Sequence, residues 1–188
     1  MSQEAVAKLF AAKAAAELAD AELIAGSGGR GWRGAPLSRL AFVVSRLSAE
    51  DLAAGGPLNG ATGEAAAKAA AAFGVPADAF FAIASRPSDP LSPADRSRRL
   101  VLAIEAADPA VVIALDEDAA SDLAESFGVA DLVPGTPARV RGRVIGAAGD
   151  LGASLADTKA KARVWVAMKA IAAEGGLKAT GRLKGAPQ

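Results

Sequence analysis

The stretch Ala110-Val111-Val112-Ile113-Ala114-Leu115 is a continuous apolar run, and the acidic residues Asp116-Glu117-Asp118 follow it directly. An apolar run of this length is typical of a strand that is buried on both of its faces. Such strands form parallel sheets with helices packed on each side. The run therefore predicts a strand of an α/β domain.

Three other segments have the composition of strands, and helices are predicted between them. The strands are expected at 40–44 (LAFVV), at 80–84 (FFAIA) and at 139–147, where polar and apolar residues alternate at one end. The helices are expected at 3–24, 61–73, 93–107, 118–127 and 158–174. This order predicts a three-layer α-β-α sandwich with a short, mostly parallel, four-stranded central sheet.

Local signals mark the ends of two of these helices. Ser92 can cap a helix, Pro93 suits its first position, and Asp95 places an acid in its first turn. Gly74 follows the helix at 61–73 and is suited to its C-terminal cap.

The length of 188 residues fits one domain of ordinary size. We expect a single domain over residues 1–176, with the helix at 3–24 packed on it. The last twelve or so residues, 177–188, contain Lys178, Arg182 and Lys184 without an acid, and we expect them to form a flexible basic tail.

The composition excludes several kinds of chemistry. The chain has no cysteine and no histidine, so a disulfide framework, a cysteine-bound zinc, an iron–sulfur cluster and a histidine base are all excluded. We expect no cofactor and no metal. Lys+Arg (21) balances Asp+Glu (21), so no global field attracts nucleic acid. No apolar segment is long enough to span a membrane or to form a signal-peptide core, and we expect a cytoplasmic protein.

Ligands of such folds bind at the carboxyl ends of the strands, so the loops of interest begin near Ser45, Ser85, Asp116 and Ala148. The acids at 116–118 could hold Mg²⁺, but adjacent acids point in different directions. We favour capping of the helix that follows.

Two further patterns lie near the N-terminus. The segment 26–31 (GSGGRG) matches a dinucleotide-binding loop by letter, but it follows a helix, and we interpret it as a connector. Trp32 could stack on a base; we favour a tryptophan that covers the sheet edge.

Arg139, Arg141 and Arg143 alternate along one predicted strand, which would place three guanidinium groups on one face. They could contact phosphate, or they could protect an edge strand by their charge.

Six segments in order resemble the uracil-DNA glycosylase superfamily, in particular the branch whose active members carry an iron–sulfur cluster. They are 39–44 (RLAFVV), 56–63 (GPLNGATG), 80–87 (FFAIASRP), 92–95 (SPAD), 108–115 (DPAVVIAL), and a last set of Leu155-Ala156-Asp157, Lys161, Arg163-Val164-Trp165 and Lys169. The resemblance spans residues 37–173 and implies a single α/β domain of this fold.

The departures from the family fall on its functional positions. Val44-Ser45-Arg46-Leu47-Ser48 stands where the family has its water-activating glutamate loop, and Leu58 replaces the phenylalanine that stacks on uracil. Phe81 replaces the asparagine that reads the uracil edge, Ser85 replaces a cluster cysteine, and Asp150 falls at or near the histidine. The resemblance implies a vestigial pocket of Ser45, Arg46, Leu47, Leu58, Asn59, Phe81, Ser85, Arg86 and Asp150.

These changes remove what base excision needs, which is a stacking platform, a donor to the leaving base and a carboxylate that orients water. We therefore interpret the chain as a catalytically inactive relative that serves as a binding or scaffold module linked to DNA repair or replication, with a protein as partner. One alternative is an active glycosylase of unusual substrate range that uses Asp150, although we favour a turn aspartate between two glycines as the explanation of this residue. The other is a non-enzymatic protein that binds DNA weakly through Arg139, Arg141 and Arg143.

Overall fold

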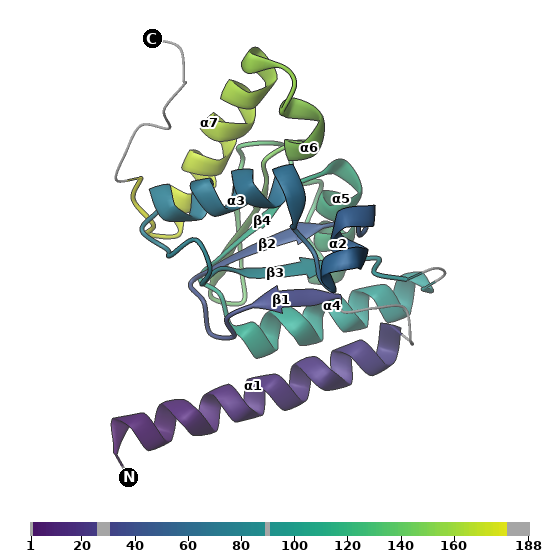
Figure 1. The fold of residues 1–188 in the computed structure, drawn as a ribbon, viewed down its shortest axis with the longest axis vertical. Helices are drawn as coiled ribbons and strands as arrows, with labels where there is room; N and C mark the ends of the chain where they lie inside the picture. The colour runs from purple at the N-terminus through teal and green to yellow at the C-terminus, as the bar shows by residue number, and fades with distance from the viewer. Residues whose placement is uncertain (1, 26–30, 89–90, 180–188) are drawn as a thin grey trace.

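The computed structural model describes residues 2–25, 31–88 and 91–179 and has a six-stranded sheet at its centre (Figure 1). The strands run in the order β1-β3-β2-β4-β6-β5 across the sheet. Their bounds are β1 (Trp32–Gly34), β2 (Leu40–Val44), β3 (Phe81–Ala84), β4 (Val111–Ala114), β5 (Ala138–Val140) and β6 (Arg143–Ala147). The inner strands β3, β2, β4 and β6 are parallel, as predicted.

The sheet has six strands, and the predicted four-stranded sheet is wrong in this respect. The two additional strands are β1, which we did not predict, and β5, which we merged with β6; they pair antiparallel with β3 and β6 at the two edges. Each is three residues long. A segment this short has too few residues for the alternation of apolar and polar side chains to appear.

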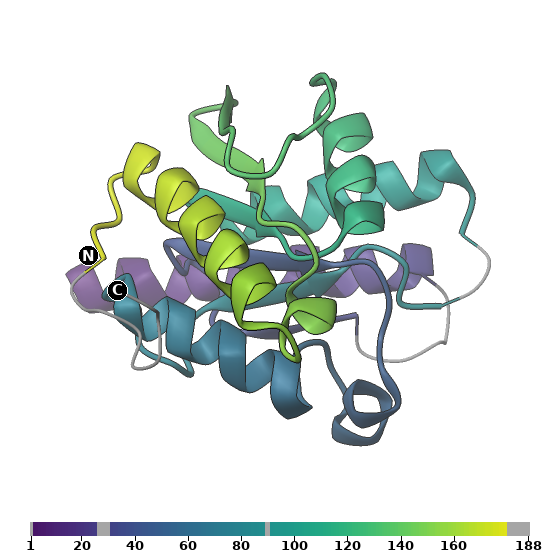
Figure 2. The same cartoon turned by 90° about the horizontal axis from the view of Figure 1, so that it is seen from above.

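Helices cover both faces of the sheet, so the three-layer α/β architecture is confirmed (Figure 2). The helices are α1 (Gln3–Ala25), α2 (Ala49–Ala54), α3 (Gly60–Ala72), α4 (Pro93–Ala107), α5 (Glu117–Phe127), α6 (Leu151–Ser154) and α7 (Thr158–Glu174). One core layer lies between the sheet and α3, α6 and α7, and the other lies between the sheet and α4 and α5. Helix α1 packs against α4 from outside.

The segment at 139–147 is a hairpin, and the single strand predicted there is wrong. Arg141 and Gly142 form the turn between β5 and β6, with φ of 49° and 80°. Positive φ at both turn residues matches the right-handed twist of the flanking strands. Arg139, Arg141 and Arg143 therefore lie in β5, in the turn and in β6, and not along one face of a single strand.

Two ends of the chain complete the description. Leu177, which we assigned to the flexible tail, is buried in the core beside α3 and α7. The segment at 26–30, part of the predicted connector, and residues 180–188 of the predicted tail lie outside the described residues. Over the described ranges, no helix combines the length and the apolar character needed to cross a membrane.

Candidate functional site

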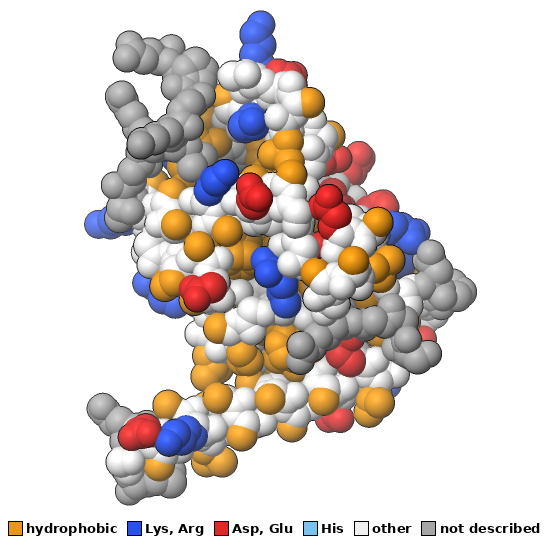
Figure 3. Space-filling view, in the orientation of Figure 1, with side chains coloured by type: hydrophobic (Ala, Val, Ile, Leu, Met, Phe, Trp, Pro, Cys, Tyr) orange, Lys and Arg blue, Asp and Glu red, His pale blue; other side chains and the backbone are white. Residues whose placement is uncertain are grey.

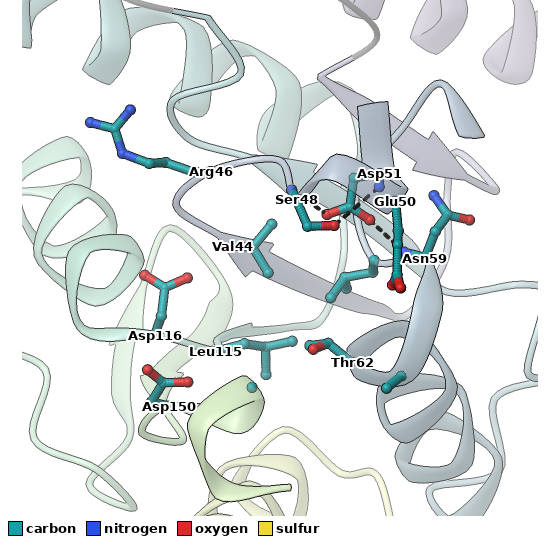
Figure 4. A pocket seen from close by; sticks show the side chains of 13 residues that line it. Val44, Arg46, Ser48, Glu50, Asp51, Asn59, Thr62, Leu115, Asp116 and Asp150 are labelled. Carbon is teal, nitrogen blue, oxygen red and sulfur yellow. Dashed lines mark hydrogen bonds between the residues drawn. The ribbon is translucent and has the colours of Figure 1, made fainter. Parts of the chain in front are cut away.

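A pocket of about 230 Å³ opens at the carboxyl ends of β2, β4 and β6 (Figure 4). Its walls come from the loop after β2, from α2 and the start of α3, and from the residues that follow β4 and β6. Of the vestigial-pocket residues, Arg46, Leu58, Asn59 and Asp150 line it. Four carboxylates and a single guanidinium stand among the lining residues, namely Glu50, Asp51, Asp116, Asp150 and Arg46.

Asp51 is buried and both of its oxygens accept backbone hydrogen bonds. Its Oδ2 accepts the N–H of Ser48 at 2.9 Å, and the Ser48 hydroxyl accepts the N–H of Asp51 at 3.1 Å. This reciprocal pair is a capping box that starts α2. Asp51 Oδ1 accepts the N–H of Asn59 at 2.6 Å, which ties α2 to the start of α3.

Asp116 and Asp150 are also helix caps. Asp116 Oδ1 accepts the N–H of Ala119 at the start of α5, and its Oδ2 accepts the N–H of Ser45, each at 2.8 Å. The predicted capping role of the acids at 116–118 is thus confirmed for Asp116. Asp150 Oδ1 accepts the N–H of Ala153 at 2.8 Å and starts α6.

Carboxylates of the protein thus occupy the starts of α5 and α6 at the pocket, whereas the start of α3 at Asn59 has no side-chain cap. The start of a helix presents unpaired N–H groups and the positive end of its dipole, which makes it a site for anions. Here the N–H groups of Ala119 in α5 and Ala153 in α6 are bonded to aspartates, as is the N–H of Ser45 after β2. A phosphate or a developing oxyanion would meet the negative charge of these carboxylates.

Phe81 does not line this pocket. It is fully buried in the opposite core layer and stacks on Trp32, with ring centroids 5.9 Å apart. Successive residues of a strand point to opposite faces, so Phe81 faces α4 while its neighbours Phe80 and Ala82 face the other layer. Trp32 lies in edge strand β1, as the sheet-edge interpretation expected.

Ser85 and Arg86 belong to a separate polar cluster built around Asp122. The Ser85 hydroxyl donates to Asp122 Oδ2 at 2.6 Å, and Arg86 Nε and Nη2 donate to its two oxygens at 2.8 and 2.9 Å. Arg96 Nε lies 2.9 Å from Asp122 Oδ1. The hydrogen bond with Asp122 raises the pKa of Arg86. Sequence reasoning missed Asp122 and Arg96, whose only signal is their place on neighbouring helices.

The three arginines of the hairpin are each paired with an acid. Arg139 lies 2.7 Å from Glu174, and Arg141 lies 3.3 Å from Glu105. The side chain of Arg143 is only 4% exposed, and it contacts Glu105 and Asp108. Arg143 is thus buried, whereas the paired side chains of Arg139 and Arg141 remain exposed.

Comparisons with known proteins add no relatives: no family model matches the chain, and no curated protein matches it significantly. The resemblance to the glycosylases rests on the residues quoted above. In the described part of the chain, no group of three or more acids, cysteines and histidines is placed to hold a metal ion. The description of the site therefore rests on the positions and contacts of its residues.

Proposed function

We propose that this protein is a catalytically inactive, uracil-DNA-glycosylase-like binding or scaffold module linked to DNA repair or replication. The observation behind the proposal is that Asp51, Asp116 and Asp150 in the pocket wall are engaged in holding backbone N–H groups. A carboxylate fixed as a helix cap is a structural element, and its negative charge opposes the anion that forms on a leaving base.

The positions that would bind a base support the same conclusion. Phe81 is turned into the far core layer, and Leu58 offers an aliphatic side chain where stacking would require a ring. Arg46 supplies a single positive charge against four carboxylates. A wider open groove of about 970 Å³ lies beside the pocket along α7, and Asp150 lines both. Such a surface offers contact area to a partner protein.

The test is an excision assay on single-stranded DNA that contains uracil, with protein purified beside an empty-vector control. We expect no uracil release above that control, because the pocket lacks a stacking ring and its four carboxylates oppose the negative charge that forms on a leaving base. Release that scales with the amount of purified protein would overturn the proposal.

The second candidate is a glycosylase that uses Asp150 as its carboxylate. In its favour, Asp150 is exposed at the pocket rim, and within the described residues its Oδ2 has no hydrogen-bond partner. Asp150→Asn distinguishes the inactive module from a glycosylase that uses Asp150. Asparagine caps a helix about as well as aspartate, so the variant should preserve the fold. Any authentic activity should disappear in this variant, whereas activity that persists rules out Asp150 as the reacting group.

A further inference from the structure

Helix α1 is held to the body of the protein by its packing against α4 and by one carboxylate, that of Glu22. Glu22 Oε1 lies 2.7 Å from Arg99 Nη2, and Glu22 Oε2 accepts the N–H of Gly31 at 2.8 Å. The Arg99 side chain is fully buried, and this burial lowers its pKa. A charge buried this deeply depends on its counterion. Glu22 is therefore a contact on which the docking of α1 depends.

The same groups close a ring of hydrogen bonds through the sheet. Arg99 Nη1 donates to the carbonyl of Ala84 at 2.6 Å, and the Ala84 N–H donates to the carbonyl of Gly31 at 2.8 Å. A Cβ on Gly31 would lie 2.0 Å from Arg99 Nη2, so a side chain at this position would displace the guanidinium. We call Glu22, Gly31, Ala84 and Arg99 the Glu22 ring. It joins α1, α4, β3 and the residue that precedes β1.

Strand β1 leads from this ring to the pocket. Arg33, two residues beyond Gly31, donates from Nη2 to the carbonyl of Leu58 at 2.7 Å. Its guanidinium carbon lies 5.4 Å from the centre of the Phe80 ring. Arg33 thus belongs to the strand that the ring positions and also contacts the pocket wall.

The peptide between Leu58 and Asn59 is held from both sides. Its carbonyl accepts from Arg33, and its N–H donates to Asp51 Oδ1 at 2.6 Å. Leu58 has φ of 60°, a left-handed conformation that is costly for a residue with a side chain. Strain of this kind persists only where the surroundings determine the conformation.

We propose that α1 is a clasp that sets the shape of the pocket. Its docking, through the Glu22 ring and Arg33, holds the Leu58–Asn59 peptide in the strained conformation, and its release lets this peptide relax. The buried side chains of α1 are Ala14, Leu18, Ala21 and Ala25, all toward its C-terminal end. The N-terminal end projects from the body with Leu9 and Phe10 exposed (Figure 3). The packing of α1 against α4 therefore lies in the middle and C-terminal part of the helix, where the Glu22 ring also lies.

Amide hydrogen exchange of the full chain, followed by NMR, tests the clasp. The reporter is the N–H of Asn59, which belongs to the held peptide. Glu22→Gln should speed its exchange about tenfold, because the ring loses a charge-assisted hydrogen bond. The matched control is Glu17→Gln, which breaks an exposed pair with Lys13 on the same helix and should leave Asn59 unchanged. Amides of β4 should also keep their rates, which shows that the effect is local.

A second background tests the route. Arg33→Met removes the bond to Leu58 while keeping an apolar chain against Phe80, and in this background Glu22→Gln should add nothing at Asn59. The proposal is overturned if Glu22→Gln leaves the Asn59 exchange rate unchanged. It is also overturned if Glu22→Gln speeds Asn59 exchange by the full factor in the Arg33→Met background.

If Glu22→Gln fails to fold, Ser88→Ala takes its place, since the Ser88 hydroxyl donates to the carbonyl of Ala25 at 2.6 Å. That variant should speed Asn59 exchange about threefold, and an unchanged rate overturns the proposal. The readout is independent of the excision assay.

Discussion

One close contact at the pocket requires a glycine, because a side chain would collide with neighbouring backbone. Gly63 in the first turn of α3 lies against the carbonyl of Leu58, and a Cβ at Gly63 would lie 1.9 Å from that oxygen. Because the obstacle is backbone, it cannot rotate away as a side chain would. The approach brings Leu58 into the pocket wall, so Gly63 links the packing of α3 to the shape of the site.

Gly63→Ala should lower the free energy of unfolding by about 2 kcal/mol, the cost of overpacking a filled site. Urea unfolding provides the measurement. Gly152→Ala is the control, since its new Cβ would meet Asp150 and Thr62 only at 3.5 and 3.6 Å. Equal stability of the two variants would show that the contact between α3 and Leu58 yields easily.

Among the secondary-structure elements, the pocket depends on the residues that cap its helices. Ser92 accepts the N–H of Asp95 and caps α4, as the sequence predicted. Asp116 has two roles, because it caps α5 and also holds the N–H of Ser45 after β2. Asp116 thus connects the ends of two neighbouring parallel strands at the pocket.

Asp116→Ala should therefore cost more than Ser92→Ala, at about 2 kcal/mol against about 1 kcal/mol. The excess reflects the N–H of Ser45, which would lose its partner. Denaturant unfolding of both variants measures the difference, and Asp116→Asn should recover only the part that one acceptor oxygen can restore, because the amide nitrogen cannot accept a second N–H. If the two alanine variants cost the same, the link from Asp116 to Ser45 contributes nothing.

At the scale of the whole molecule, Asp122 connects three parts of the fold. Its carboxylate is 2% exposed and binds Ser85 and Arg86 after β3 as well as Arg96 on α4. Asp122 itself lies on α5. Removing Asp122 leaves Arg86 and Arg96 only their more exposed partners Asp118 and Glu125, which costs far more than the loss of a surface pair.

Asp122→Ala should lower the free energy of unfolding by about 3 kcal/mol, since both arginines keep some access to water. Asp118→Ala provides the control, because Asp118 is 57% exposed, binds Arg86 from outside and should change stability by less than about 1 kcal/mol. Thermal and urea unfolding give the comparison. If the two variants lose a similar amount of unfolding free energy, the buried contacts of Asp122 contribute no more to stability than the exposed pair of Asp118.

The sequence by itself determined the inner parallel strands and the main helices. β2 and β4 are continuous apolar runs, and Ser92, Pro93 and Asp116 start helices through contacts within a few residues. Signals of this kind act locally, so they are visible in the order of residues. The sequence also pointed to the carboxyl edge of the sheet, where the pocket opens.

The tertiary structure alone decided the edge strands, the side of the sheet that Phe81 faces, and the partners of the charged groups. β1 and β5 exist because a longer neighbour offers unpaired backbone groups. Arg143 meets Glu105, 38 residues away, and Arg33 meets Leu58, 25 residues away. Such pairs depend on the packing of the whole chain, since no local pattern encodes which distant acid or carbonyl a guanidinium will reach.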